Sequence, residues 1–200
     1  VDVAEALKAG WLELWYQPKI DLRDLTPSGA EAMLRMRHPA WGVVPPSRFI
    51  PDENDALFNA VSEFAIDRAI EDWRYLLERK GPVDLAINLP ISFLGNDAAV
   101  REMCRRMPGD RAFGGMLIEI ECSEVIENLD LVLETARRLR SHNIAISIDK
   151  VGTEWPALMG LEGFPFVELK IDPQFVTNAA DDRLKQSVCR RIVERHQIAL

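Results

Sequence analysis

Four short runs of apolar residues, each with a polar residue at or near its end, dominate the hydrophobic pattern of this chain. Short, nearly continuous apolar runs are typical of buried strands. The runs are Val83 to Asn88, Met116 to Glu121, Ile144 to Asp149 and Phe166 to Ile171. The polar residues at or near their carboxyl ends are Asn88, Glu119, Asp149 and Lys170. We therefore expect four buried strands, each presenting a polar side chain near the same end.

Longer segments have the spacing of helices with one buried face. Between the second and third predicted strands, apolar residues recur at spacings of three and four. These residues are Leu129, Val132, Leu133, Ala136 and Leu139. Residues 56–80 and 181–196 show similar patterns with charged outer faces, and residues 1–10 are consistent with a short helix. The chain is therefore expected to alternate strands with helices.

The sequence intervals between the polar strand ends indicate parallel strands. Glu119 follows Asn88 by 31 positions and Asp149 follows Glu119 by 30, the length of one strand plus one crossover helix. A doubly wound sheet or a closed barrel would fit. The patterns GxGxxG and GxxxxGK[ST], usual in doubly wound nucleotide-binding folds, do not occur in the sequence. Functional side chains at several strand ends are typical of a barrel, so we predict an α/β fold, a TIM-like (β/α) barrel of one domain.

Composition and charge narrow the classes of partner. The chain has 32 acidic and 24 basic residues, a formal net charge of −8, which argues against broad binding to duplex nucleic acid through its phosphates. No apolar run approaches the ~20 residues that span a bilayer, and the first residues lack the basic start of an export signal. The three cysteines form no CxxC pair, so we expect neither a disulfide framework nor a zinc site. A cytoplasmic protein fits these features best, and small anionic ligands remain open.

A cluster of oxygen donors is expected at the mouth of the barrel. Parallel strands would bring Asn88, Glu119 and Asp149 together there, and Glu31, in the segment "AEAMLRM", is a candidate fourth member. Carboxylate and amide oxygens are the ligand set of Mg²⁺ or Mn²⁺. Zinc is disfavoured because the three histidines are scattered along the sequence. The alternative for any single acid is a solvated side chain or a helix cap.

Five blocks of sequence carry a resemblance to a known family. They are "WYQPKIDL", "EAMLRMRHPAWGVVPPSRFI", "LAINLP", "LIEIECS" and "LKIDPQFV", and they run from about Leu14 to the end of the chain. In this order they resemble the EAL domains, which hydrolyse the bacterial second messenger cyclic di-GMP. The resemblance implies a fold, an activity and roles for the matching residues.

The implied roles fall into two groups. The metal ligands would be Glu31, Asn88, Glu119 and Asp149, with Glu31 and Lys170 as the catalytic residues. Lys170 would orient or activate the attacking water and stabilise phosphodiester charge. The dinucleotide site would comprise Gln17, Met33, Arg35 and Asp172. In that site the planar guanidinium of Arg35 would bind a phosphate. Met33 would occupy the position of the leucine in the family's EAL motif, and Asp172 would help to fix Lys170.

Three positions depart from the family pattern. Lys150 replaces the second of two consecutive aspartates, Cys122 replaces the second glutamate of LEITES, and Glu154 replaces a glycine of FGTG. At about 4 Å, like charges in a partly buried site repel by roughly 4 kcal/mol, so Lys150 disfavours a second metal ion. Its ammonium would instead take the ion's place and pair with Asp149 and Glu31, unless it points to solvent. The cofactor is then Mg²⁺ or Mn²⁺ if any, and none if Lys150 replaces the metal.

These departures lead to two main hypotheses. The first is a degenerate, catalytically impaired EAL domain that acts in cyclic di-GMP signalling as a nucleotide receptor or a regulatory protein-binding module. The alternative is an active Mg²⁺- or Mn²⁺-dependent cyclic di-GMP phosphodiesterase. The expected partners are cyclic di-GMP and other protein domains, and a homodimer is left open. The resemblance also implies that residues 1–200 are one EAL-like domain from which a C-terminal part of about 40–50 residues, with the last barrel strands, is absent.

Overall fold

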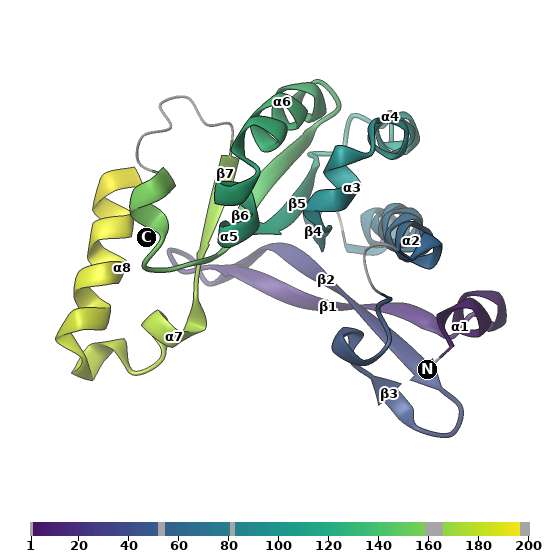
Figure 1. Ribbon diagram of the computed structural model, residues 1–200, viewed down its shortest axis with the longest axis horizontal. Helices are drawn as coiled ribbons and strands as arrows, with labels where there is room; N and C mark the ends of the chain where they lie inside the picture. The colour runs from purple at the N-terminus through teal and green to yellow at the C-terminus, as the bar shows by residue number, and fades with distance from the viewer. Residues whose placement is uncertain (1, 52–54, 81–82, 159–165, 197–200) are drawn as a thin grey trace.

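One seven-stranded sheet forms the centre of the computed structural model, which describes residues 2–51, 55–80, 83–158 and 166–196 (Figure 1). The strands are β1 (Leu12–Asp21), β2 (Thr26–His38), β3 (Gly42–Val44), β4 (Leu85–Asn88), β5 (Met116–Glu121), β6 (Ile144–Val151) and β7 (Phe166–Ile171). Their order is β1-β2-β4-β5-β6-β7, with β3 paired to β2 off this path. β1, β2 and β3 pair antiparallel, and the remaining pairs are parallel.

Helices flank the sheet, and those in the connections between the strands from β2 to β6 cover one side of it. They are α1 (Val3–Ala9), α2 (Ala56–Lys80), α3 (Ile91–Gly95), α4 (Asp97–Arg106), α5 (Cys122–Glu127), α6 (Leu129–Arg140), α7 (Pro173–Val176) and α8 (Arg183–His196). Three short 3-10 helices, η1 (Pro46–Arg48), η2 (Trp155–Leu158) and η3 (Ala179–Asp181), lie in the loops. Figure 1 shows α6, α3, α4 and α2 succeeding one another around the sheet.

The predicted strands and helices are confirmed, with small shifts of their ends. All four apolar runs form parallel strands, and the predicted helices correspond to α1, α2, α6 and α8. The β1–β2 hairpin is an addition. Its strands alternate apolar with polar residues and include Pro18, so they lack the continuous apolar runs that predicted the other strands.

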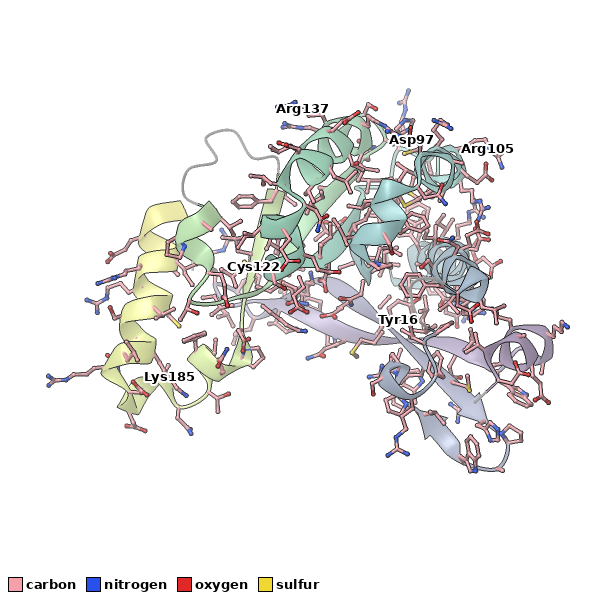
Figure 2. All side chains as sticks on the ribbon, in the orientation of Figure 1. Tyr16, Asp97, Arg105, Cys122, Arg137 and Lys185 are labelled. Carbon is pink, nitrogen blue, oxygen red and sulfur yellow. The ribbon has the colours of Figure 1, made fainter. Side chains whose placement is uncertain are left out.

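The two faces of the sheet differ sharply in chemistry. Along β5, Met116, Ile118 and Ile120 are buried in the main hydrophobic core with residues of α2, α4 and α6, whereas Glu119 and Glu121 alternate with them and face the other way. This two-residue alternation is the normal geometry of a strand. On the helices, charged side chains such as Arg105 on α4 and Arg137 on α6 point outward (Figure 2). The acids of the strands therefore line the inner, concave side, away from the helix layer.

A second, smaller hydrophobic core packs against the carboxyl-terminal part of β2. It joins α1, the start of β1, β2, β3, the residue after η1 and the first half of α2. The buried residues are Val3, Ala6, Leu12, Met36, Val44, Phe49 and Val61. Asp2 caps α1 by accepting a hydrogen bond from the backbone N–H of Glu5, and Gly10 ends the helix at φ 69°, a conformation that glycine adopts without strain. This packing fixes the part of β2 that carries Arg35.

The described strands do not close into a ring. β7 pairs only with β6 and β1 only with β2 among the described residues, so these two strands are the free ends of the sheet. The predicted α/β architecture with parallel strands is confirmed, whereas the absence of a C-terminal part stays a prediction. Within the described segments, no helix is both long and apolar enough to cross a membrane.

Candidate functional site

The register of the parallel strands lines up polar side chains across the inner face of the sheet. Asn88 on β4 is opposite Glu119 on β5, Glu119 is opposite Ser147 on β6, and Ser147 is opposite Glu168 on β7. Asp149 and Lys170 each lie two positions nearer the carboxyl end, so they share this face. The sheet therefore brings the predicted strand-end residues into one cluster.

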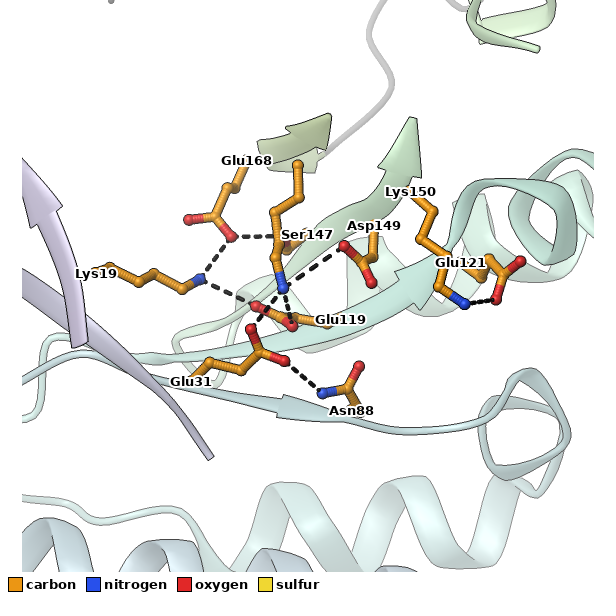
Figure 3. A network of polar contacts seen from close by, with 10 residues as sticks. Lys19, Glu31, Asn88, Glu119, Glu121, Ser147, Asp149, Lys150 and Glu168 are labelled. Carbon is orange, nitrogen blue, oxygen red and sulfur yellow. Dashed lines mark hydrogen bonds and ion pairs between the residues drawn. The ribbon is translucent and has the colours of Figure 1, made fainter. Parts of the chain in front are cut away.

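The ammonium of Lys170 lies at the centre of this cluster. Its Nζ atom is 2.7 Å from Oε2 of Glu31, 2.7 Å from Oε2 of Glu119 and 3.6 Å from Oδ1 of Asp149. The amide of Asn88 donates to the other oxygen of Glu31 at 3.0 Å. Figure 3 shows the three carboxylates and Asn88 converging from four strands. All five residues were named from the sequence, and the structure brings them together.

Burial and hydrogen bonding set the charges of the cluster. Burial opposes the charge of Lys170, but hydrogen bonds to Glu119 and Glu31 outweigh it and raise the pKa of the ammonium. For Glu31, burial is again opposed by the hydrogen bonds from Lys170 and Asn88, and its pKa is lowered. The side chain of Glu119 has no exposed surface, and burial raises its pKa despite contacts from two lysines. Glu119 is thus the acid that depends most on its partners to stay ionised.

A second ammonium, which the sequence analysis did not single out, holds Glu119 from another direction. Lys19 on β1 donates to Oε1 of Glu119 at 3.0 Å and to Oε1 of Glu168 at 2.6 Å. Ser147 donates to the same oxygen of Glu168 at 2.7 Å. The sequence does contain a signal for Glu168 and Ser147, because side chains two positions apart on a strand lie on the same face. Glu168 lies two positions before Lys170, and Ser147 lies two positions before Asp149. Lys19 lies in the "YQPKID" segment, where no strand was predicted.

A cavity of about 430 Å³ opens beside the acidic cluster at the carboxyl ends of the strands. Its lining includes six of the predicted site residues: Met33, Arg35, Asn88, Glu119, Asp149 and Lys150. Apolar residues of α2, such as Phe58 and Val61, form another wall. Gln17 is instead in a smaller hollow of about 270 Å³ with Lys19, Glu31 and Lys170. A larger hollow of about 810 Å³ lies at the opposite ends of β5, β6 and β7, away from these groups.

Arg35 offers a free cation at the rim of this cavity. Its guanidinium donates to the carbonyl oxygen of Leu34 at 2.7 Å, approaches the sulfur of Met33 at 3.6 Å, and lies 5.9 Å from the centre of the Trp15 ring. It has no carboxylate partner in the described part of the chain. Most of its donors are therefore available to an anionic ligand.

Lys150 sits in a β-bulge and does not have the partners expected of it. The register between β6 and β7 shifts between Ile148 and Val151. As a result, two residues of β6, Asp149 and Lys150, lie opposite a single residue of β7, Lys170. Lys150 has φ 54°. The expected pairing of its ammonium with Asp149 and Glu31 is wrong, since Nζ binds Oε2 of Glu121 at 2.7 Å (Figure 3).

The Lys150–Glu121 pair is at the mouth rather than in the cluster. The side chains are 52% and 43% exposed. Their hydrogen bond lowers the pKa of Glu121 and raises the pKa of Lys150. The bulge turns Lys150 outward along the sheet, so that Lys170, and not Lys150, lies among Glu31, Glu119 and Asp149.

Asp172 and Cys122 both have structural contacts outside the acidic cluster. Asp172 caps α7 by accepting a hydrogen bond from the backbone N–H of Gln174 at 2.8 Å, so the expectation that it fixes Lys170 is corrected. Cys122 is buried at the start of α5. Burial raises the pKa of its thiol to about 11, with a further contribution from the nearby carboxylate of Glu154. The thiol is therefore a packed, neutral group.

The donor set fits a hard divalent cation. Among the described residues, Glu31, Glu119, Asp149 and Glu168 form ion pairs with two ammoniums, those of Lys19 and Lys170. These six groups have a formal charge of −2, which one divalent cation would balance. Within the described ranges, no three His, Cys, Asp or Glu side chains are grouped so that they could hold a metal ion as they stand. The Lys170 ammonium occupies the point where the oxygens converge. A metal ion there requires Lys170 to move aside.

Comparison with known proteins identifies the family. Residues 1–198 match the EAL domain, and the chain therefore belongs to the EAL domain family. It is 29% identical over 200 residues to the cyclic di-GMP phosphodiesterase NbdA of Pseudomonas aeruginosa, covering 98% of this chain and 25% of that protein. It is 30% identical over 198 residues to the bifunctional diguanylate cyclase/cyclic di-GMP phosphodiesterase MucR of the same organism, covering 96% of this chain and 28% of MucR. The chain thus spans about a quarter of the length of these relatives.

Solved structures share the fold. The PaMucR phosphodiesterase in its c-di-GMP complex has a TM-score of 0.81 and 27% identity, covering 98% of this chain and 81% of that chain. The Xanthomonas citri FimX EAL domain in complex with c-diGMP has a TM-score of 0.82 over 98% of this chain and 77% of that chain, and at 20% identity it supports the fold alone. These likenesses confirm the TIM-like barrel, of which the described strands form an unclosed part.

Proposed function

We propose that this chain is a degenerate EAL domain that binds cyclic di-GMP beside its acidic cluster and hydrolyses it poorly or not at all. The observation that carries the proposal is Lys150 in the bulge next to Asp149, where the family resemblance implies a second metal-ligating aspartate. The substitution removes a carboxylate ligand of that second ion, and the ammonium of Lys150 adds positive charge near Asp149. Two-metal hydrolysis uses both ions to stabilise the attacking and leaving oxygens, so the change would lower turnover while leaving the groups that bind the ligand in place.

The cavity supports binding of a dinucleotide. Arg35, which has no carboxylate partner among the described residues, is a planar donor for a phosphate, and Met33 and the apolar wall from α2 suit the flat face of a base. The solved PaMucR relative is a c-di-GMP complex, which supports the same class of ligand here. Lys150 at the mouth adds a second cation near the same cavity.

A single divalent cation is compatible with this proposal. EAL phosphodiesterases generally depend on divalent metals, and Glu31, Asn88, Glu119 and Asp149 would hold one Mg²⁺ or Mn²⁺ here. When bound, such an ion would polarise a phosphodiester oxygen. Lys170 would balance the acids in the absence of metal and, once displaced, would remain close enough to stabilise phosphate charge.

Active hydrolysis is the second candidate. It is supported by the convergence of all four proposed metal ligands with Lys170, and by the names of the curated relatives, several of which are cyclic di-GMP phosphodiesterases. The relatives are also much longer than this chain, which supports action together with other protein domains. A homodimer and a cytoplasmic location stay predictions.

Calorimetric titration with cyclic di-GMP, in EDTA and in Mn²⁺, with product analysis by chromatography, tests the proposal. We expect binding in both buffers with little linear dinucleotide formed. Rapid Mn²⁺-dependent conversion would favour the phosphodiesterase instead. No binding in either buffer would leave a scaffold without nucleotide recognition and refute the proposal.

A further inference from the structure

Lys19 links three strands through the interior of the curved sheet. Its ammonium binds Glu119 on β5 at 3.0 Å and Glu168 on β7 at 2.6 Å (Figure 3). β1 and β7 are the two ends of the strand order and form no ladder with each other in the described segments. The Lys19–Glu168 contact therefore connects the free ends of the sheet directly, across 149 positions of sequence.

The register places Lys19 one layer beneath the proposed metal ligands. Lys19 is opposite Gly29, two positions before Glu31 on β2. Ser147 and Glu168 likewise lie two positions before Asp149 and Lys170. Lys19, Ser147 and Glu168 therefore form a connected floor on the side away from the mouth.

The two ammoniums hold opposite oxygens of one buried carboxylate. Lys170 binds Oε2 of Glu119, and Lys19 binds Oε1. Lys170 also binds Glu31 and approaches Asp149, so a cation ligated by these acids would compete with it for its position. Lys19 contacts neither Glu31 nor Asp149 in the described structure. It can therefore keep hold of Glu119 while Lys170 moves aside.

We propose that Lys19 is a positioning residue that orients Glu119 toward a divalent cation, with Glu168 and Ser147 fixing Lys19 in turn. The inference rests on the proposed function, because it assumes that a cation binds among Glu31, Glu119 and Asp149. Groups that orient a metal ligand from behind typically contribute 10- to 100-fold to metal affinity. The role is the same in a receptor and in an enzyme, since it concerns the ion and not the bond that is cleaved.

The test is the affinity of the nucleotide-free protein for Mn²⁺, measured from the electron paramagnetic resonance signal of the free ion. We expect Lys19→Met to weaken Mn²⁺ binding about 10-fold or more and Lys19→Arg to restore part of it. Arg23→Met is the matched control, because Arg23 pairs with Asp21 at the exposed tip of the same hairpin, and it should leave the affinity unchanged. Unchanged affinity in Lys19→Met would overturn the inference.

Two milder variants decide the matter if Lys19→Met does not fold. Glu168→Gln and Ser147→Ala leave both ammoniums in place but loosen Lys19, so each should weaken Mn²⁺ binding about 3-fold or more, less than the roughly 10-fold expected when an orienting group is removed outright. No loss in either variant would overturn the inference, as would a protein that binds no Mn²⁺. Cyclic di-GMP binding in EDTA is measured separately. Its failure would refute nucleotide recognition, while the Mn²⁺ series would still decide the role of Lys19.

Discussion

The Nζ atom of Lys170 lies 2.7 Å from Oε2 of Glu119, whose side chain has no exposed surface. At the mouth, Nζ of Lys150 lies the same 2.7 Å from Oε2 of Glu121, but both of those side chains are about half exposed. Equal distances do not imply equal energies, because water screens the outer pair more than the inner one, in which Glu119 is fully buried. The two lysines therefore make a matched comparison within one molecule.

Lys170→Met should lower the free energy of unfolding by about 1.5–3 kcal/mol, because it removes hydrogen bonds between charged groups and leaves the acids with one fewer counter-charge. Lys150→Met should cost less than about 1 kcal/mol, as exposed ion pairs usually do. Urea unfolding in EDTA measures both. Equal losses in the two variants would show that the inner cluster is not the more strongly coupled one.

Stability should fall on acidification partly through Glu31. Its pKa is lowered from 4.5 in the folded protein, so its contribution is present above that ordinary value and is lost as the pH falls through the folded pKa. In Glu31→Gln this contribution is gone, and the free energy of unfolding should decline less steeply below pH 4.5. Urea titrations at successive pH values between neutrality and acid would show it. Parallel curves for the two proteins would contradict the prediction.

Arg35→Ala should weaken cyclic di-GMP binding about 10-fold or more, because a charge-assisted contact to phosphate contributes roughly 1.5–3 kcal/mol. Arg37→Ala is the control, since Arg37 lies two positions further along β2, pairs with Glu13 at 2.9 Å and does not line the cavity. Calorimetry on both variants makes the comparison. The cavity would be the wrong binding site if Arg37→Ala were the more damaging change.

Lys150→Asn should keep or raise stability. Residues other than glycine, asparagine and aspartate are strained near φ 54°, at roughly 1–2 kcal/mol, and the exposed pair with Glu121 contributes less than about 1 kcal/mol. The net gain should be about 0.5–1 kcal/mol in urea unfolding. Glu121→Gln removes the same pair but keeps the strained lysine, and should be neutral or slightly destabilising. A clear loss in Lys150→Asn would mean that the pair outweighs the strain.

Lys150→Asp should strengthen the response of the protein to Mn²⁺. It removes the cation at the mouth and places a new carboxylate beside Asp149 and Glu121, which raises the negative charge that a divalent ion can balance. We expect Mn²⁺ to raise the melting temperature of this variant more than that of the unmodified protein, with binding of cyclic di-GMP or weak hydrolysis now dependent on Mn²⁺. If Mn²⁺ stabilises both proteins equally, Lys150 does not oppose a second ion.

The sequence by itself determined the parallel strands, their helices and most of the inner cluster. Each strand or helix buries one or both of its faces, and this burial sets the spacing of apolar residues along the element, so the spacing can be recognised in the sequence alone. Parallel strands end at the same edge of a sheet, so Asn88, Glu119, Asp149 and Lys170 could be placed together without coordinates. The helix-capping role of Asp172 could also have been predicted from the sequence, since an aspartate followed by proline is a typical start of a helix.

Only the tertiary structure decided which ammonium meets which carboxylate. The bulge at Asp149 and Lys150 depends on the register between β6 and β7, and it directs Lys150 to Glu121 rather than into the cluster. Lys19 reaches Glu168 across 149 positions of sequence. Such contacts depend on inter-strand register and sheet curvature, which arise from packing of the whole chain and leave no periodic signal near the residues themselves.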